Sequence, residues 1–187
     1  MSITIKRLMR ERIDMEKNRE KLKEEGIEFN LDEDDIYHAK AMIIGPEGSP
    51  YEKCPFFFDF KFTEKYPFEP PKVLFRTTNG KTRFHPNLYV DGKVCLSILN
   101  TWQGPTWSSC QNFRTVLLTI QSIMDDNPIT HEPSYEKEVK KPGSRAQKYH
   151  DVVQHQCFLT ALNQQAKKMP HGFEMFIPSV KQLIIDN

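Results

Sequence analysis

The sequence predicts an α+β fold built on an antiparallel sheet, and the order of its patterns carries this prediction. A helical pattern opens the chain, segments of alternating apolar residues follow it, and further helical patterns occupy the second half. Links rich in glycine and proline join the strand-like segments, as in hairpin loops. With 187 residues, the chain is long enough to bury the core of one main domain.

Composition and charge exclude several classes of protein. Charged residues make up 27% and hydrophobic residues 38%, as in ordinary globular proteins, and the net charge of +1 gives no general attraction to nucleic acid or an anionic membrane. Residues 1–17 interleave charged and apolar side chains, and no other window is apolar over a membrane-spanning length. We therefore expect neither a secretory signal nor a membrane anchor.

The cysteines indicate free thiols. They are widely scattered and include no CxxC pair, so the pattern predicts neither a metal site nor a disulfide framework. We expect reduced thiols and a location in the cytoplasm or the nucleus. The four residues are Cys54, Cys95, Cys110 and Cys157.

Residues 4–17 predict an amphipathic helix with a basic outer face. Apolar side chains recur at helical spacing at Ile5, Leu8, Met9 and Ile13. The intervening basic residues are Lys6, Arg7, Arg10 and Arg12. Such a charged face is usually solvated, and a partner surface is the alternative.

Three segments that follow predict strands. In residues 36–45, IYHAKAMIIG, apolar and more polar side chains alternate, and in residues 55–62, PFFFDFKF, four phenylalanines share one face. The link at 45–53, GPEGSPYEK, reads as a hairpin loop. Prolines in residues 66–71 then interrupt regular structure before a short strand, KVLFRT, at 72–77.

The second half of the chain predicts helices. Ser108 and Gln111 form a capping-box pattern before a long apolar stripe that Asn127 and Pro128 should end. From about residue 140 the chain becomes basic and polar, then shows a helical pattern around residues 149–157 and a second short helix near Pro178. We expect a core at 1–139 and a C-terminal helical extension at 140–187 packed on it, with a partner or substrate surface as the alternative role of the extension.

The stretch HPNLYVDGKVC, residues 85–95, suggests a catalytic thiol. The Asp91–Gly92 dipeptide favours a two-residue turn, which would set Leu88 opposite Cys95 and Asn87 at the next step. A free thiol with a pKa near 8.5 is already partly thiolate at neutral pH, so Cys95 can act as a nucleophile without an adjacent base. The amide of Asn87 can then stabilise the oxyanion that forms on attack at an acyl carbon.

Structural roles remain open for the same residues. An isolated cysteine is often a small buried hydrophobe, and a loop asparagine often bonds only nearby backbone. His85 could act as a base, but the proline after it makes a structural brace an equal alternative. The catalytic interpretation requires that a macromolecule can reach the thiol of Cys95.

These motifs, in this order, resemble those of the ubiquitin-conjugating enzymes over residues 3–139. The resemblance rests on GPEGSPYEK, YPFEPPKV, the HPN at 85–87, Cys95 eight residues after Asn87, and a tryptophan-serine loop before a long helix. It is strongest to large members such as the inhibitor-of-apoptosis-repeat type. The family fold that it implies has an N-terminal helix, a four-stranded antiparallel meander sheet, a long central helix and C-terminal helices.

The resemblance also implies a function. Cys95 would accept ubiquitin from an activating enzyme as a thioester and pass it to lysine amines of substrates, alone or with a ligase. Asn87 would support the oxyanion, while His85 and Pro86 hold the loop. No cofactor is implied for this chain, because the activating enzyme consumes the ATP.

Partner surfaces follow by the same resemblance, which also implies a monomer. Lys6 and Arg10 on the first helix would meet the activating enzyme, and a ligase would dock on Phe68 and the loop at Trp107, Ser108 and Ser109. Family members commonly carry serine-proline-alanine in that loop, whereas this chain has Ser108, Ser109 and Cys110, which leaves its usual ligases in question.

A second departure lies after the long helix, in residues 126–137, which we call the gate segment. Family members place an acidic or serine gate residue there, but this chain reads DNPITHEPSYEK. Thr130, His131 or Glu132 could orient the incoming lysine and help to remove its proton, or the segment could be an ordinary polar loop.

Three other functions are compatible with parts of the pattern. A thiol hydrolase could use a cysteine, a histidine and an asparagine, although such enzymes gather them from distant positions. A noncatalytic ubiquitin-binding adaptor would not need Cys95. A conjugating enzyme for another ubiquitin-like modifier is the closest competitor, because surfaces decide the choice of modifier.

Overall fold

The computed structural model describes residues 1–185. Its α-helices are α1 (Ile3–Lys17), α2 (Arg19–Glu24), α3 (Phe113–Ser122), α4 (Arg145–Gln156), α5 (Gln165–Lys167) and α6 (Ile177–Ile185). Its strands are β1 (Ile27–Leu31), β2 (His38–Ile44), β3 (Pro55–Lys61) and β4 (Lys72–Phe75). Short 3-10 helices lie at Ser97–Leu99, Pro128–His131 and Glu174–Phe176. The sequence therefore predicted the α+β class correctly. Within residues 1–185, no helix combines the length and the apolar character needed to cross a membrane.

The four strands form an antiparallel meander in the order β1-β2-β3-β4. Ala41 of β2 pairs with both Phe29 of β1 and Phe58 of β3, and Phe58 pairs in turn with Phe75 of β4. The sequence pattern located three of these strands. The segment of β1, IEFNL, is too short for clear alternation, so only the resemblance indicated a fourth strand.

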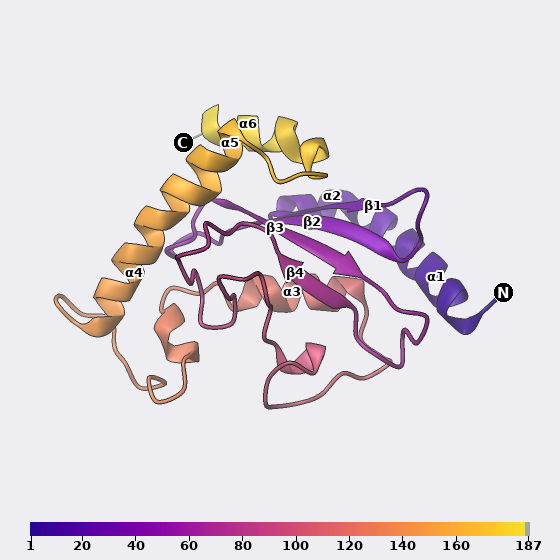
Figure 1. Ribbon diagram of the computed structural model, residues 1–187, viewed down its shortest axis with the longest axis horizontal. Coiled ribbons are helices and arrows are strands. Elements are labelled where there is room, and N and C mark those ends of the chain that lie inside the picture. The colour runs from indigo at the N-terminus through magenta and orange to yellow at the C-terminus, as the bar shows by residue number, and fades with distance from the viewer. Residues whose placement is uncertain (186–187) are drawn as a thin grey trace.

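One face of the sheet packs on α3 to form the main core. Phe56, Phe58 and Phe60 alternate along β3 and are fully buried on this face, as the sequence predicted. Phe113 at the start of α3 contacts Phe60 edge to face, with ring centroids 4.8 Å apart. In Figure 1, α3 lies below the sheet and the C-terminal segment lies above it.

The other face of the sheet is covered by the end of the chain. Met42 and Phe57 point to this side and pack against Phe173, Phe176 and Val180. The ring centroids of Phe57 and Phe173 are 5.4 Å apart in an edge-to-face arrangement. The sheet is therefore buried on both faces, and the extension packs on the core. The boundary at residue 139 stays a prediction.

The first helix buries a different face from the predicted one. Its buried residues are Thr4, Leu8, Glu11 and Met15, whereas Met9 and Ile13 are exposed. Glu11 is buried because it bonds to the hydroxyl of Tyr66 and the backbone amide of Phe113. Apolar spacing alone did not indicate that a carboxylate would face the core.

The predicted ends of the long helix were also wrong. The helix begins after Asn112, whose side-chain oxygen accepts from the amide of Thr115 at 2.9 Å, and it ends at Ser122 rather than at Asn127. Ser108 and Gln111 make one hydrogen bond of a capping box, from the Ser108 amide to the Gln111 side chain, but they form a turn ahead of the helix.

The extension begins as one long helical rod. From α4 the helix continues through a π-helical stretch, Cys157–Gln164, into α5. Asn79 anchors this stretch to the core by donating to Gln156 at 3.2 Å and to Thr160 at 3.1 Å. The helix predicted near Pro178 is α6, which begins at Ile177.

Candidate active site

The hairpin before Cys95 has a three-residue turn rather than the predicted two-residue turn. The amide of Tyr89 donates to the carbonyl of Lys93 at 2.9 Å, and Gly92 closes the turn with a φ of +92°. A Cβ atom at Gly92 would lie 2.7 Å from the carbonyl oxygen of Phe75, so the turn needs glycine to dock against β4. The pairing shifts by one residue, and Leu88 lies opposite Val94.

This shift places Asn87 directly beside Cys95. The amide of Cys95 donates to the Asn87 carbonyl at 2.9 Å, and the Asn87 side-chain amide donates to the Cys95 carbonyl at 2.6 Å. Asn87 thus holds the backbone on either side of the thiol. Its side-chain donor is engaged in this conformation, so support of an oxyanion requires it to leave the Cys95 carbonyl.

Thr101 fixes the other flank of Cys95, a role that the sequence did not reveal. Its hydroxyl donates to the carbonyl of Val94 at 2.9 Å and accepts from the amide of Leu96 at 3.0 Å. The residues before and after Cys95 are therefore held by one side chain. A threonine in a loop after a strand gives no local signal of this role, because the contact depends on how the loop returns.

Cys95 is more buried than the catalytic interpretation anticipates. Only 1% of its surface is exposed, and Val94, Leu96 and Asn87 around it are also buried. The requirement that a macromolecule can reach the thiol is not met by this conformation. Acyl transfer to Cys95 needs a conformation in which the thiol is more exposed.

Two of the other cysteines are poor nucleophiles because their thiols have raised pKa values. Burial raises the pKa of Cys54 to about 12 and the pKa of Cys157 well above its usual value. Both thiols therefore stay protonated at neutral pH, and both are buried in the main core, Cys157 from the extension itself. Cys110 is exposed in the loop before α3.

His85 is a neutral brace in this structure. It is fully buried, and its Nδ1 atom accepts from the backbone amide of Asn87 at 3.0 Å. Burial, with a smaller contribution from the nearby His131, lowers the pKa of His85 to about 3. A group with so low a pKa cannot serve as a general base at neutral pH, which removes the base that a thiol hydrolase would need.

The gate segment meets this brace through His131. The two histidine rings lie 4.8 Å apart, and the Nε2 atom of His131 bonds to a carboxylate oxygen of Asp125 at 2.7 Å. Burial favours a raised pKa for Asp125, but the hydrogen bond and the charge of His131 outweigh it, and the pKa lies below its usual value. Asp125 was not singled out in the sequence, where it reads as part of a helix end.

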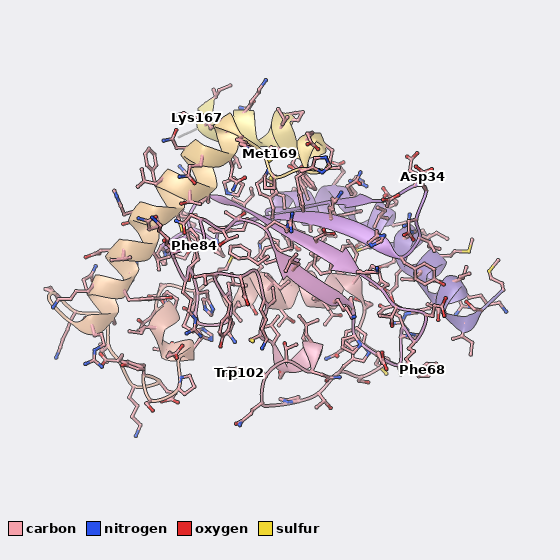
Figure 2. All side chains as sticks on the ribbon, viewed as in Figure 1. Asp34, Phe68, Phe84, Trp102, Lys167 and Met169 are labelled. Atoms are coloured by element: carbon pink, nitrogen blue, oxygen red, sulfur yellow. The ribbon has the colours of Figure 1, made fainter. Side chains whose placement is uncertain are left out.

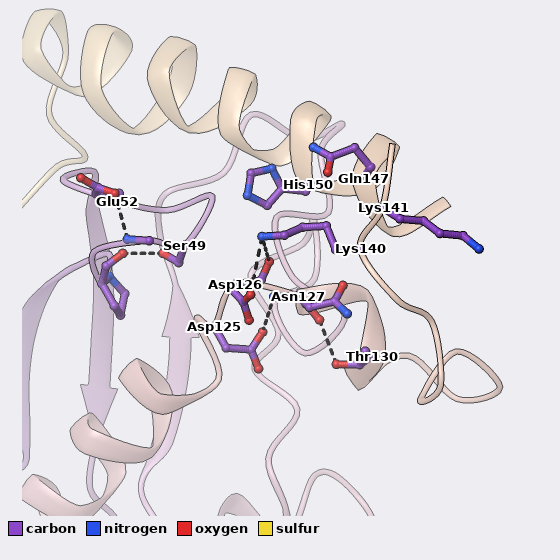
Figure 3. A network of polar contacts seen from close by, with 12 residues as sticks. Ser49, Glu52, Asp125, Asp126, Asn127, Thr130, Lys140, Lys141, Gln147 and His150 are labelled. Atoms are coloured by element: carbon purple, nitrogen blue, oxygen red, sulfur yellow. Dashed lines mark hydrogen bonds and ion pairs between the residues drawn. The ribbon is translucent and has the colours of Figure 1, made fainter. Parts of the chain in front are cut away.

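The other two gate candidates are also engaged. The hydroxyl of Thr130 donates to the carbonyl of Asn127 at 2.8 Å, within its own turn (Figure 3). The side-chain amide of Asn127 in turn donates to the carbonyl of Glu138. Glu132 forms an ion pair with Arg83 at 3.1 Å, and Arg83 donates to the carbonyl oxygen of Pro86. The structure brings Glu132 and His131 to the loop at 85–87, whereas Thr130 holds the gate segment itself.

The predicted ligase surface divides into exposed and buried parts. Phe68 is 69% exposed and projects from the lower right of the molecule in Figure 2, and Ser108 and Ser109 are also exposed. Trp107 is only 9% exposed, and its indole N–H donates to the carbonyl of Pro67 at 2.7 Å. Trp107 therefore ties the two loops together, and its assignment as a ligase contact stays a prediction.

The predicted surface for an activating enzyme is accessible. Lys6 and Arg10 are exposed on α1, on the side away from the buried Leu8 and Met15. Neither forms an ion pair in residues 1–185. The structure shows that these side chains are free for a partner, and the nature of that partner stays a prediction.

The sequence of this chain matches a known protein family. The family model described as ubiquitin-conjugating enzyme matches residues 7–157, which include the hairpin, the gate segment and all of α4. The match therefore extends past the core boundary predicted at residue 139.

Three relatives illustrate the similarity. Ubiquitin-conjugating enzyme E2 Z of Homo sapiens is 43% identical over 68% of this chain and 36% of its own length. Probable ubiquitin-conjugating enzyme protein 17 of Caenorhabditis elegans is 38% identical over 78% of this chain and 21% of its own. The dual E2 ubiquitin-conjugating enzyme/E3 ubiquitin-protein ligase BIRC6 of Homo sapiens is 42% identical over 64% of this chain and 3% of its own. This chain thus spans well under half the length of these relatives.

Proposed function

This chain belongs to the ubiquitin-conjugating enzyme family, and on that premise we propose that it carries ubiquitin as a thioester on Cys95 and transfers it to lysine amines. The sulfur of Cys95 attacks the thioester carbonyl of ubiquitin held on an activating enzyme, and the enzyme's thiolate leaves. The amine of a lysine then attacks the new thioester, loses a proton, and releases the thiolate of Cys95.

One observation carries this proposal within the site. Side-chain hydrogen bonds hold the backbone of Cys95 and of both its neighbours. Asn87 bonds the carbonyl of Cys95, and Thr101 bonds the backbone of Val94 and of Leu96. Such fixing preorganises the backbone at a reacting atom and has no evident value at an ordinary buried cysteine. Catalysis then depends on the fixed position of the Cys95 thiol and on the intrinsic nucleophilicity of a thiolate.

Asn87 supplies the oxyanion donor in this proposal. When its amide leaves the Cys95 carbonyl, the same N–H group can turn toward the oxygen of the thioester carbonyl, whose carbon is bonded to the sulfur. His85, Pro86 and Arg83 keep the loop in place while this exchange occurs. Of the gate candidates, Glu132 carries the carboxylate best suited to receive a lysine, since its partner Arg83 holds it beside Pro86.

Partners are proposed on the same premise. Lys6 and Arg10 would contact the activating enzyme, and Phe68 with Ser108 and Ser109 would contact a ligase. The chain itself would act as a monomer in the cytoplasm or nucleus and need no cofactor, since the activating enzyme uses the ATP. Another ubiquitin-like modifier remains the second candidate, because the same chemistry serves any tail that ends in a carboxylate.

The test is thioester formation with purified components. The protein is mixed with activating enzyme, ATP and ubiquitin, and an adduct that thiol reductant removes is expected. Cys95→Ala should abolish the adduct, whereas Cys110→Ala, which removes the exposed thiol, should retain it. An adduct that persists in Cys95→Ala would overturn the proposal. Replacing ubiquitin with a related modifier in parallel reactions tests the second candidate.

A further inference from the structure

A groove of about 520 Å³ borders the loop at residues 85–87 and is formed with the help of the extension. Pro86 lines it from the loop at 85–87, Ile129 and Tyr135 line it from the gate segment, and Tyr149 and Val152 line it from α4. In Figure 1, α4 runs down the left edge of the molecule beside the segment that follows α3. The lining of the groove is thus largely apolar, and the groove lies next to the loop that holds Cys95.

The charged groups around this groove are mostly cationic. Three cations, Arg83, Arg145 and Lys148, line it with a single carboxylate, Glu132, and that carboxylate is already paired with Arg83 at 3.1 Å. Arg145 lies over the ring of Tyr135, 5.0 Å from its centroid. In the described part of the chain, neither Arg145 nor Lys148 forms an ion pair. We call this site the basic groove.

The position of these cations works against the stability of α4. Arg145 and Lys148 lie within the first four residues of the helix, and its first turn contains no acidic residue. Cations at a helix N-terminus are unfavourable, because the backbone dipole is positive there. Since no carboxylate in residues 1–185 pairs with them, they can form ion pairs with a ligand.

We propose that the basic groove binds a segment of the acceptor protein in which carboxylates flank an apolar side chain, close to the lysine that receives ubiquitin. Arg145 and Lys148 pair with the carboxylates, and Ile129 with Val152 receives the apolar side chain. This inference rests on the proposed function, because it names the class of substrate that the same site accepts.

The position of the groove supports an acceptor rather than a distant partner. Pro86 lines the groove and directly precedes Asn87, which bonds the backbone of Cys95. A bound segment therefore lies within reach of the thioester. The apolar lining favours a polypeptide over nucleic acid, which is usually bound by a larger set of cations along its phosphates.

Binding is tested first, without any chemistry. The probe is a fluorescein-labelled peptide with one lysine, one leucine and flanking glutamates, and its match replaces every glutamate with glutamine. Fluorescence anisotropy should show that the unmodified protein binds the glutamate peptide roughly tenfold more tightly, since two exposed charge pairs contribute about that much. Raising the salt concentration should reduce this difference.

Variants assign the effect to the basic groove. Arg145→Glu with Lys148→Glu should abolish the preference for glutamate, and the acidic replacements suit the helix N-terminus, so α4 should remain folded. Lys167→Glu with Lys168→Glu makes the same change in net charge at exposed positions where α5 ends and should keep the preference. Circular dichroism of both proteins checks that they are folded.

Transfer is tested next on the loaded protein. In single-turnover reactions, the ratio of discharge to the glutamate peptide over the glutamine peptide should exceed one for the natural chain and fall to about one in the Arg145/Lys148 double variant. Failure to form any thioester would overturn the proposed function, while the anisotropy experiment would still test the groove. Equal binding of the two peptides, a preference retained in the double variant, or equally tight binding of a single-stranded oligonucleotide would each overturn the inference.

Discussion

At the scale of single residues, the hydrogen bond between Asn87 and Cys95 links structure to proposed chemistry. The side-chain amide of Asn87 already donates to the Cys95 carbonyl at 2.6 Å, so the residue both positions the thiol and holds the donor that an oxyanion needs. Because one N–H donor serves both roles, any substitution that removes it should slow the proposed chemistry.

Asn87→Ala should still form the thioester with ubiquitin but discharge it poorly. Loss of one oxyanion donor typically lowers a rate roughly a hundredfold to a thousandfold. Single-turnover discharge to free lysine measures this step. Asn87→Asp keeps the shape of the side chain but removes its N–H donor, and it should be equally slow. Discharge at the natural rate in both variants would show that Asn87 is only structural.

His85 should make the protein sensitive to acid. Because its pKa is about 3 when folded and near 6.5 when unfolded, the unfolded chain binds a proton between these values and the folded chain does not. The stability that His85 confers is therefore present above about pH 6.5 and is lost as the pH falls toward 3. Acidification from about pH 7 to pH 5 should cost about 2 kcal/mol through this residue.

Urea unfolding of natural and His85→Gln protein at the two pH values measures this cost. The loss of stability on acidification should be smaller in His85→Gln by about that amount. His155→Gln, which changes an exposed histidine on α4, should leave the loss unchanged. Equal losses in natural and His85→Gln protein would contradict the account of His85 as a buried neutral group.

At the scale of elements, α1 is joined to two distant segments by Glu11. The carboxylate accepts from the hydroxyl of Tyr66 at 2.5 Å and from the amide of Phe113 at 2.9 Å, and it pairs with Arg7. This single group satisfies a donor at the start of α3 and anchors the loop that follows β3. The first helix is thus fixed by a polar contact where apolar spacing predicted a simple amphipathic face.

Glu11→Gln should lower the free energy of unfolding by about 2 kcal/mol. A neutral amide keeps only part of the hydrogen bonding and leaves the half-buried Arg7 without its partner. Urea unfolding followed by circular dichroism measures the change. Glu16→Gln, also on α1, breaks an exposed ion pair with Arg19 of α2 and should cost at most about 1 kcal/mol. Equal effects of the two changes would argue against a special role for Glu11.

At the scale of the whole molecule, the extension closes the second face of the sheet. Phe173 is fully buried and packs on Phe57 of β3, so residues far apart in sequence share a second small core. The rod from α4 to α5 carries the chain over to this face and lines the basic groove as it passes. The extension therefore contributes to both stability and the proposed substrate site.

Phe173→Ala should loosen the C-terminal segment. Removing a buried aromatic ring typically costs about 3 kcal/mol or more, here limited by the free energy with which the segment docks. Limited proteolysis should release a fragment ending near α5, and hydrogen exchange of β3 should rise around Phe57. Phe158→Ala removes a ring that is 59% exposed and should change neither. Unchanged proteolysis in Phe173→Ala would show that this contact does not hold the segment.

Local sequence alone determined several features of this protein. Alternation of phenylalanines fixed β3 and its buried face, proline and glycine fixed the loops, and the order of motifs around Cys95 indicated the family before any contact was known. These features depend on neighbours in the chain, because backbone preference and side-chain periodicity act over a few residues. A short strand such as β1 gave too few residues for the same inference.

The tertiary structure decided the arrangement of the site. One extra residue in the turn set Asn87 opposite Cys95, the returning loop brought Thr101 to both flanks of the thiol, and packing made His85 neutral. Packing also buried Cys95, turned Glu11 inward and covered Phe57 with the end of the chain. Each of these depends on atoms distant in sequence, since burial and hydrogen-bond partners are properties of the folded chain and not of any segment alone.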